Sequence, residues 1–149
     1  MEPRDPAYRE QVSRIFDQAA HVREVGIVLN DLGPGWCETQ LAVQPKHLQQ
    51  TYVVHAGVLA TLADHTAGAA ASTLLPAEAF VLSVEFKINL LRAARGPKLW
   101  CRAQVLKAGR RIFVVESEVF STSDADTKLV AKATVTLAVL KREPSNPDS

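Results

Sequence analysis

The chain has 149 residues, which is enough for one compact domain with a buried core and too few for two ordinary ones. Its formal net charge of +1 provides no overall field that favours binding to nucleic acid or to an anionic membrane. The N-terminus lacks the pattern of a signal peptide and no apolar run has the length of a membrane span, so we expect a soluble cytoplasmic protein. Cys37 and Cys101 lack metal-ligand spacing and are expected to be reduced thiols, with a disulfide as the alternative.

The first predicted element is one short amphipathic helix. Asp5 is a suitable capping residue, Pro6 suits the first helical position, and apolar residues follow at helical spacing: Val12, Ile15, Phe16 and Ala19. Residues 23–45 then hold two extended runs separated by Gly33-Pro34-Gly35, a turn signal that predicts a hairpin. Pro45 is expected to end the second strand, and a connecting loop follows it.

A long helix is predicted from Gly57 to about Leu74, with Pro76 as its terminator. Four extended runs follow, at residues 80–91, 98–108, 110–122 and 127–140. The first alternates cleanly, which predicts one apolar face and one polar face; the apolar face is Leu82, Val84, Phe86, Ile88 and Leu90, and the polar face includes Ser83 and Lys87.

This order of elements predicts an α+β domain with an antiparallel sheet that is covered by helix on one face. We expect a single domain over residues 1–142 and a polar, disordered tail over residues 143–149.

Asp64 is the unusual residue of the long helix. Its neighbours at helical spacing are very small, namely Ala60, Ala67, Gly68 and Ala71. Such a stripe allows another backbone or a slender ligand to approach closely, and Gly68 costs about 1 kcal/mol relative to alanine. A structural aspartate on a polar edge is the alternative interpretation.

The start of this helix, His55-Ala56-Gly57, is the second candidate feature. Backbone N–H groups in the first turn have no partner within the helix and carry the positive end of its dipole. The N–H groups of Ala56 and Gly57 can therefore stabilise the oxyanion that a carbonyl becomes during acyl transfer.

The segment "HAGVLATLAD" resembles the HGG...D signature of hotdog-fold acyl-CoA thioesterases of the phenylacetic-acid-degradation type. The downstream "LSVEFKINLLRAA", the "GRR" turn and the closing apolar strand keep that family's order from about Val22 to Leu140. The resemblance implies a hotdog fold, in which a curved antiparallel sheet of about six strands wraps a long central helix. It also implies hydrolysis of an acyl-CoA thioester to a free acid and CoA, without a cofactor or metal.

The resemblance assigns roles residue by residue. Asp64 falls where the family has its general base or nucleophile, and the N–H of Ala56 falls where the family polarises the thioester carbonyl. His55 receives a structural or orienting role, with direct action as a general base as the alternative. Gln49 falls where relatives have an Asn or Gln near the thioester, and Ser83 falls where some relatives have a hydroxyl that orients water. In the family these groups meet across a subunit interface, so the resemblance implies a homodimer or a dimer of dimers (a homotetramer).

An acyl-CoA substrate also needs a site for its phosphates. Lys107, Arg110 and Arg111 cluster around the Gly109 turn, and with Lys87 and Gly57 they are the predicted substrate-binding residues, with a solvated hairpin tip as the alternative. A second basic group consists of Arg92, Arg95 and Lys98.

Ala56 stands where the family motif has its first glycine, which keeps a rival open: a non-catalytic hotdog dimer that binds acyl-CoA. A hotdog hydratase is a further alternative, although its Asp/His pair is not evident. His21, His47 and His65 have no metal-ligand spacing and are interpreted as surface or packing residues.

Overall fold

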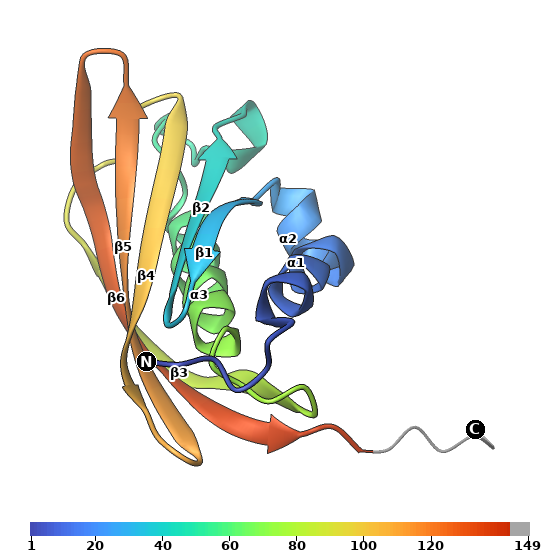
Figure 1. Ribbon diagram of the computed structural model, residues 1–149. Coiled ribbons are helices and arrows are strands. Elements are labelled where there is room, and N and C mark those ends of the chain that lie inside the picture. Colours follow the sequence, from blue (N-terminus) through green and yellow to red (C-terminus); the bar gives the residue numbers. More distant parts are fainter. Residues whose placement is uncertain (144–149) are drawn as a thin grey trace.

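The computed structural model describes residues 1–143, in which six antiparallel strands form one curved sheet with all the helices on one side (Figure 1). The strand order is β1-β2-β4-β5-β6-β3. This arrangement confirms the predicted α+β hotdog architecture with a long central helix. The strands are β1 (Val28–Gly33), β2 (Trp36–Ala42), β3 (Ala79–Leu90), β4 (Lys98–Ala108), β5 (Ile112–Ser123) and β6 (Asp126–Lys141).

The predicted domain 1–142 lies within the described residues, whereas nearly all of the predicted tail, residues 143–149, lies outside them. No helix within residues 1–143 has both the length and the hydrophobicity that crossing a membrane requires. Cys37 and Cys101 are buried free thiols on neighbouring strands of the core. Burial raises the pKa of Cys101 to about 12, so these thiols belong to the packing rather than to a reactive site.

The N-terminal helical region consists of two helices, which corrects the prediction of one. Helix α1 (Tyr8–Gln18) ends at Ala19, whose extended backbone separates it from α2 (Ala20–Val25). Gly26 then ends α2 in the left-handed conformation with a φ of 96°. The hairpin that was expected from residue 23 therefore begins only at Val28. Asp5 accepts the backbone N–H of Ala7 and so precedes the helix instead of capping its first residue.

The connection before the long helix is held to α2 by a buried histidine. A 3-10 helix (Pro45–His47) begins where the second strand of the hairpin was expected to stop. The ring of His47 accepts the Gln44 N–H through Nδ1 at 2.9 Å and donates from Nε2 to the Val25 carbonyl at 2.6 Å. His47 is therefore a packing residue that fixes the path of the chain into the next helix.

Helix α3 (Ala56–Ser72) packs in the concave face of the sheet. Two buried hydrogen bonds attach it there: Ser117 Oγ donates to the Ala63 carbonyl at 2.8 Å, and the Thr39 and Thr66 hydroxyls lie 2.7 Å apart. The remaining contacts are apolar and involve the buried side of the helix, including Leu59, Leu62, Ala67 and Ala70. With this side against the sheet, Asp64 lies on the partly exposed flank.

A bulge in β3 changes which residues face α3. Strand β3 pairs with β6, and the register shifts between Ser83 and Glu85, leaving Val84 as the extra residue. Paired residues in an antiparallel sheet share a face, and both Ser83 and Phe86 oppose buried residues of β6. The predicted uninterrupted alternation is therefore wrong: Ser83 lies on the helix side together with Phe86, while Leu82 lies on the opposite face.

Candidate active site

The first turn of α3 is capped by a side chain, and only one of its leading N–H groups stays free. His55 is the N-cap residue, and its Nδ1 accepts the Gly57 N–H at 2.8 Å. Nδ1 accepts this bond in the neutral ring, so the ring proton is on Nε2. The N–H of Ala56 has no acceptor within residues 1–143. Of the two donors that the sequence suggested, only Ala56 therefore remains available to a carbonyl oxygen.

The same geometry explains why this chain has alanine first and glycine second in its motif. Ala56 has no positive φ, so the helical start requires no glycine there. At Gly57, a Cβ would lie 3.0 Å from His55 Nδ1, against the ring that caps the helix. The motif thus keeps glycine at the position where a side chain would disturb the cap.

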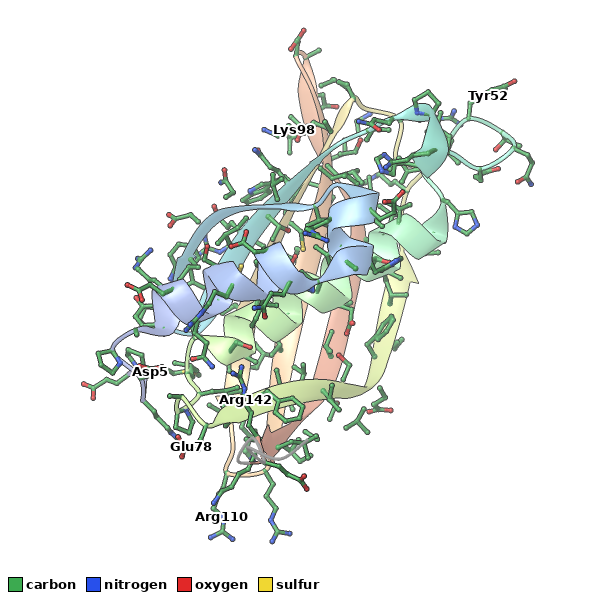
Figure 2. All side chains as sticks on the ribbon, turned by 90° about the vertical axis from the view of Figure 1, so that its right-hand side faces the viewer. Asp5, Tyr52, Glu78, Lys98, Arg110 and Arg142 are labelled. Carbon is green, nitrogen blue, oxygen red and sulfur yellow. The ribbon has the colours of Figure 1, made fainter. Side chains whose placement is uncertain are left out.

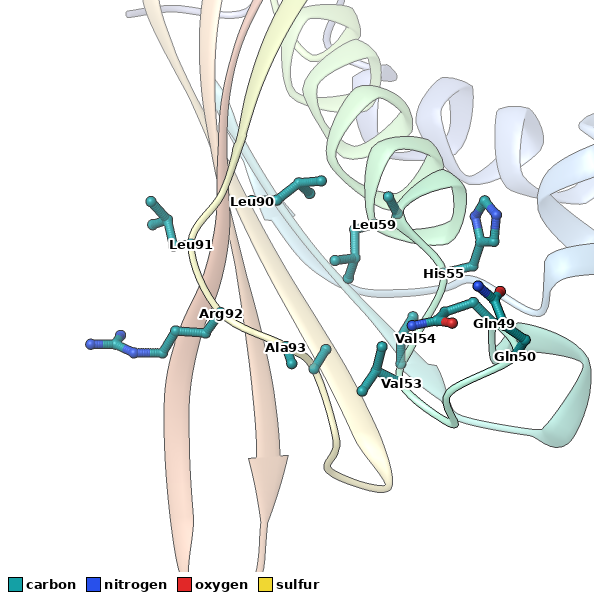
Figure 3. Close-up of a pocket in the computed structure, with 12 residues that line it drawn as sticks. Gln49, Gln50, Val53, Val54, His55, Leu59, Leu90, Leu91, Arg92 and Ala93 are labelled. Atoms are coloured by element: carbon teal, nitrogen blue, oxygen red, sulfur yellow. The ribbon is translucent and has the colours of Figure 1, made fainter.

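A pocket of about 580 Å³ opens beside this helix start (Figure 3). Gln49, His55, Ala56 and Leu59 line one side, and residues 90–94, from the last residue of β3 onward, line the other. The Gln49 amide is held within its own turn, because its Oε1 accepts the Thr51 N–H at 2.8 Å. The pocket combines the free N–H of Ala56 with walls that are partly apolar and partly polar.

Asp64 forms the second cluster, near the middle of α3. Ser83 Oγ donates to Asp64 Oδ1 at 2.6 Å, across from β3 to α3. The bulge at Val84 makes this contact possible, because it turns Ser83 toward the helix. The hydroxyl holds one carboxylate oxygen, which leaves the other free to accept a proton from water or to attack a carbonyl.

Two hollows flank Asp64. One, of about 310 Å³, lies toward the C-terminal end of α3, and its walls combine apolar residues such as Ile15, Val81 and Leu137 with the polar His65, Ser72 and Ser83. The other, of about 320 Å³, lies toward the N-terminal end and is lined by His21, Val22, Ala60, Thr61, His65 and Phe86. The carboxylate is thus accessible from both sides.

His65 packs next to this carboxylate as a neutral wall residue. Its ring meets Phe16 edge-on, with 4.6 Å between the ring centroids. Burial, with a smaller contribution from His21, lowers the pKa of His65 to about 4. Its Nε2 is buried and has no hydrogen-bond partner within residues 1–143. At neutral pH the ring therefore supplies no positive charge to the site.

The two clusters are too far apart to act on one thioester within a single chain. Ala56 and Asp64 are eight residues apart in α3, about 12 Å along the axis at roughly 1.5 Å per residue. A carbonyl that accepts the Ala56 N–H must lie within hydrogen-bond distance of it, about 3 Å. Within one chain, the Ala56 N–H and the Asp64 carboxylate therefore cannot both reach the same thioester carbonyl group.

The predicted phosphate-binding residues do not surround either cluster of the same chain. Arg110, at the β4–β5 turn, lies at the opposite end of the molecule from Tyr52, which is close in sequence to the start of α3 (Figure 2). Lys107 and Arg111 are exposed in the same hairpin, and Lys87 pairs with Thr134 on the face of β3 that points away from the helix. Arg92 borders the large pocket, but its side chain points away from Gln49 and donates to the Leu129 carbonyl at 3.3 Å (Figure 3).

Sequence patterns did not identify several wall residues of these hollows. Phe86 beside Asp64 and Leu90 beside Ala56 have only the signal of an apolar strand face, and His65 has only that of a packing residue. For Ile15 the signal was present, because its helical spacing predicted a buried face of the first helix. What the sequence did not show was that this face borders the carboxylate.

Comparison with known proteins identifies the family. Residues 52–128 match the thioesterase superfamily. A thioesterase family protein from Silicibacter pomeroyi has a similar structure, with a TM-score of 0.88 and 33% identity over 90% of this chain and 98% of that one. A conserved protein from Pseudomonas aeruginosa shares 38% identity over 81% of this chain and 94% of its own, with a TM-score of 0.75. A thioesterase from Haemophilus influenzae has a TM-score of 0.83 and 25% identity over 98% of this chain and 99% of that one. The chain belongs to the thioesterase superfamily.

Proposed function

We propose that the protein is an acyl-CoA thioesterase of the phenylacetic-acid-degradation type, whose active site is shared between two subunits. The hydrogen bond from Ser83 to Asp64 carries this proposal, because it holds a carboxylate beside two hollows in a chain of the thioesterase superfamily. The superfamily and its named relatives support thioester hydrolysis in general terms. CoA as the thiol and the individual residue roles belong to the proposal.

In this mechanism the thioester carbonyl accepts the N–H of Ala56, and Asp64 of the other subunit removes a proton from water. The hydroxide oxygen bonds to the carbonyl carbon, the developing oxyanion is stabilised by the N–H and the helix dipole, and the C–S bond then breaks. CoA leaves as a thiolate, which takes up a proton, and the carboxylic acid is released. In the nucleophilic variant, Asp64 itself attacks and water hydrolyses the resulting anhydride.

The exposed edge strand β3 favours the formation of a dimer. It ends the sheet, is 12 residues long, and exposes apolar side chains such as Leu82, Val84 and Leu90. A long apolar edge with unpaired backbone groups is a template for pairing with another strand. Antiparallel pairing of β3 with its copy satisfies these groups, and it brings Ser83 and Asp64 of one subunit toward Leu90 and Ala56 of the other.

The proposed pairing of β3 with its copy also brings the basic hairpin of one subunit close to the pocket of the other. The Arg111 carbonyl accepts the Val139 N–H, and Val139 pairs with Val81 at the start of β3. Antiparallel pairing places this end of β3 next to the partner's Leu90 end, which lines the pocket at the partner's helix start. The hairpin of Lys107, Arg110 and Arg111 is thus remote from its own pocket and near that of the partner, where it is positioned to bind the phosphates of CoA.

The test is thiol release from a panel of acyl-CoAs by wild type and Asp64→Asn. The asparagine keeps the shape and the bond to Ser83 but cannot take up the proton, so we expect kcat to fall about 100- to 10,000-fold with little change in KM. Full turnover by Asp64→Asn refutes the mechanism. If wild type binds CoA esters saturably and releases no thiol at high protein concentration, the binding-only alternative is correct instead.

A further inference from the structure

Gly68 has no structural reason to be glycine. Its backbone φ is not positive, so the helix imposes no conformation that an alanine would resist. A Cβ at this position meets only Leu137 Cδ2, at 3.9 Å, which is ordinary van der Waals contact. Glycine inside a helix is less stable than alanine. Neither the backbone nor the packing of this chain therefore accounts for the residue.

The space that Gly68 leaves open adjoins the proposed carboxylate. Gly68 follows Asp64 by four residues in α3, so the two lie on one face of the helix. The hollow of about 310 Å³ over Gly68 has an apolar part that includes Ile15, Val81 and Leu137, and its polar lining consists of Asp64, His65, Ser72 and Ser83. The nearby Ser72 hydroxyl is already bonded to the Gly68 carbonyl at 2.8 Å, so it makes no polar demand on an occupant.

The size and chemistry of this hollow define its occupant. An apolar cavity of about 150 Å³ binds benzene, so about 310 Å³ accommodates a six-membered ring or a chain of similar carbon number. The hollow on the other side of Asp64 has a similar volume, about 320 Å³, but Gly68 does not line it.

We infer that Gly68 is a specificity-determining residue: it keeps the hollow beside Asp64 open for an apolar acyl group of several carbons, as a chain or a ring. This inference rests on the proposed function, because it requires that Asp64 acts at the thioester carbonyl. The acyl group then extends from the carbonyl toward the C-terminal end of α3, over the exposed backbone of Gly68.

The experiment compares Gly68→Ala with wild type on acetyl-, hexanoyl- and benzoyl-CoA, with thiol release as the readout. The methyl group enters the hollow while the helix gains propensity, so we expect the Tm to rise by about 2–4 °C. We also expect kcat/KM for hexanoyl- and benzoyl-CoA to fall at least about tenfold relative to acetyl-CoA, which is the effect of one methylene in an apolar pocket. Ile15→Ala widens the opposite wall and is expected to shift the same ratio the other way.

Ser13→Ala is the matched control. Ser13 is exposed in α1, so the substitution improves helix propensity without entering the hollow. Its Tm is expected to rise slightly and its acyl preference to stay at the wild-type ratio. A shifted preference in this control would mean that stability, not occupancy, changes the ratio, and would overturn the inference.

The other outcomes separate the inference from the proposed function. A higher Tm of Gly68→Ala with an unchanged acyl ratio refutes the role of Gly68 and leaves thioester hydrolysis intact. An equal loss on all three esters also refutes it, because the change then affects catalysis rather than selection. If wild type releases no thiol from any ester, the proposed function fails, and the inference fails with it.

Discussion

The start and the middle of α3 differ in chemistry, and the proposed function assigns them opposite halves of one reaction. Within residues 1–143, the start offers a free N–H at Ala56 and a pocket of about 580 Å³ whose lining contains no carboxylate, whereas the middle offers the Asp64 carboxylate, held by Ser83. Neither cluster suffices for acyl transfer, and the helix separates them. This difference supports the proposal that two chains together form the functional unit, and the predictions below test it.

The largest effect is expected from separating the subunits. Val84→Lys places a cation near the centre of the exposed edge strand β3, where two like charges meet in an antiparallel pair. We expect a monomer in sedimentation and thiol release at background level, although Ala56 and Asp64 are unchanged. Val28→Lys is the matched control, because Val28 is an exposed valine on β1, the opposite edge of the sheet. If the monomeric Val84→Lys retains activity, a shared site is wrong.

The second largest effect on thiol release is expected when the backbone N–H donor at the start of α3 is removed. Ala56→Pro deletes the free N–H, and proline is favoured at the first position of a helix. The preceding His55 has φ −61° and ψ 137°, which is the conformation that a residue before proline adopts. We expect a wild-type Tm and a kcat lower by about 100- to 1,000-fold, as for loss of one oxyanion donor. Unchanged kcat would show that Ala56 does not bind the carbonyl.

A smaller effect on kcat is expected when the hydrogen bond to Asp64 is removed. Ser83→Ala removes the hydroxyl that holds Asp64 Oδ1 but keeps the carboxylate itself. We expect kcat to fall about tenfold with KM nearly unchanged, because the hydrogen bond positions the base rather than binding substrate. A change confined to KM would place Ser83 in substrate binding instead.

A smaller effect, on KM for CoA esters, is expected from the basic hairpin that the partner subunit contributes in the proposed site. Arg110→Ala combined with Arg111→Ala is expected to raise KM for CoA esters about tenfold at low salt, and less at high salt because of screening. The comparison variant, Arg95→Ala with Lys98→Ala, removes the same charge from the second basic group of the sequence. If this second pair raises KM and the hairpin pair does not, the phosphates bind at the other end of the sheet.

The smallest predicted effect concerns pH and stability. His65 has a pKa near 4 when folded and about 6.5 when unfolded, so the unfolded chain binds more protons between these values. The contribution of the neutral His65 ring to the free energy of unfolding is fully present above pH 6.5 and is lost as the pH falls toward 4. We expect about 1–2 kcal/mol of this loss between pH 7 and pH 5, measured by urea unfolding. In His65→Leu the acid dependence should shrink by that amount, and an unchanged slope would contradict the assignment.

Patterns in the sequence predicted the order of the elements well, because periodicity and turn residues are local properties. The alternation of residues 80–91 and the turn signals at Gly33 and Gly109 correspond to observed strands and hairpins. The division of the N-terminal helical region at Ala19 was not predicted, because alanine favours helix and carries no stop signal.

The residue types of the proposed site can be named from the sequence, whereas their geometry cannot. A bulge has no periodic signature, so the sequence placed Ser83 on the wrong face of its strand, and only the paired register turns it to Asp64. The loss of the Gly57 N–H to the His55 ring depends on a rotamer. In the proposed function a second chain completes the site, and no pattern within one chain describes where that second chain lies.

The most direct test of a shared site is complementation between Asp64→Asn and Ala56→Pro. Each variant alone is expected to be nearly inactive. When the two chains are refolded together, about half of the dimers are mixed, and in these one of the two sites takes Asp64 and the Ala56 N–H from unaltered positions. The mixture is therefore predicted to recover about a quarter of the wild-type rate. A mixture no more active than its components, with mixed dimers demonstrated by differential tagging, would contradict the shared site.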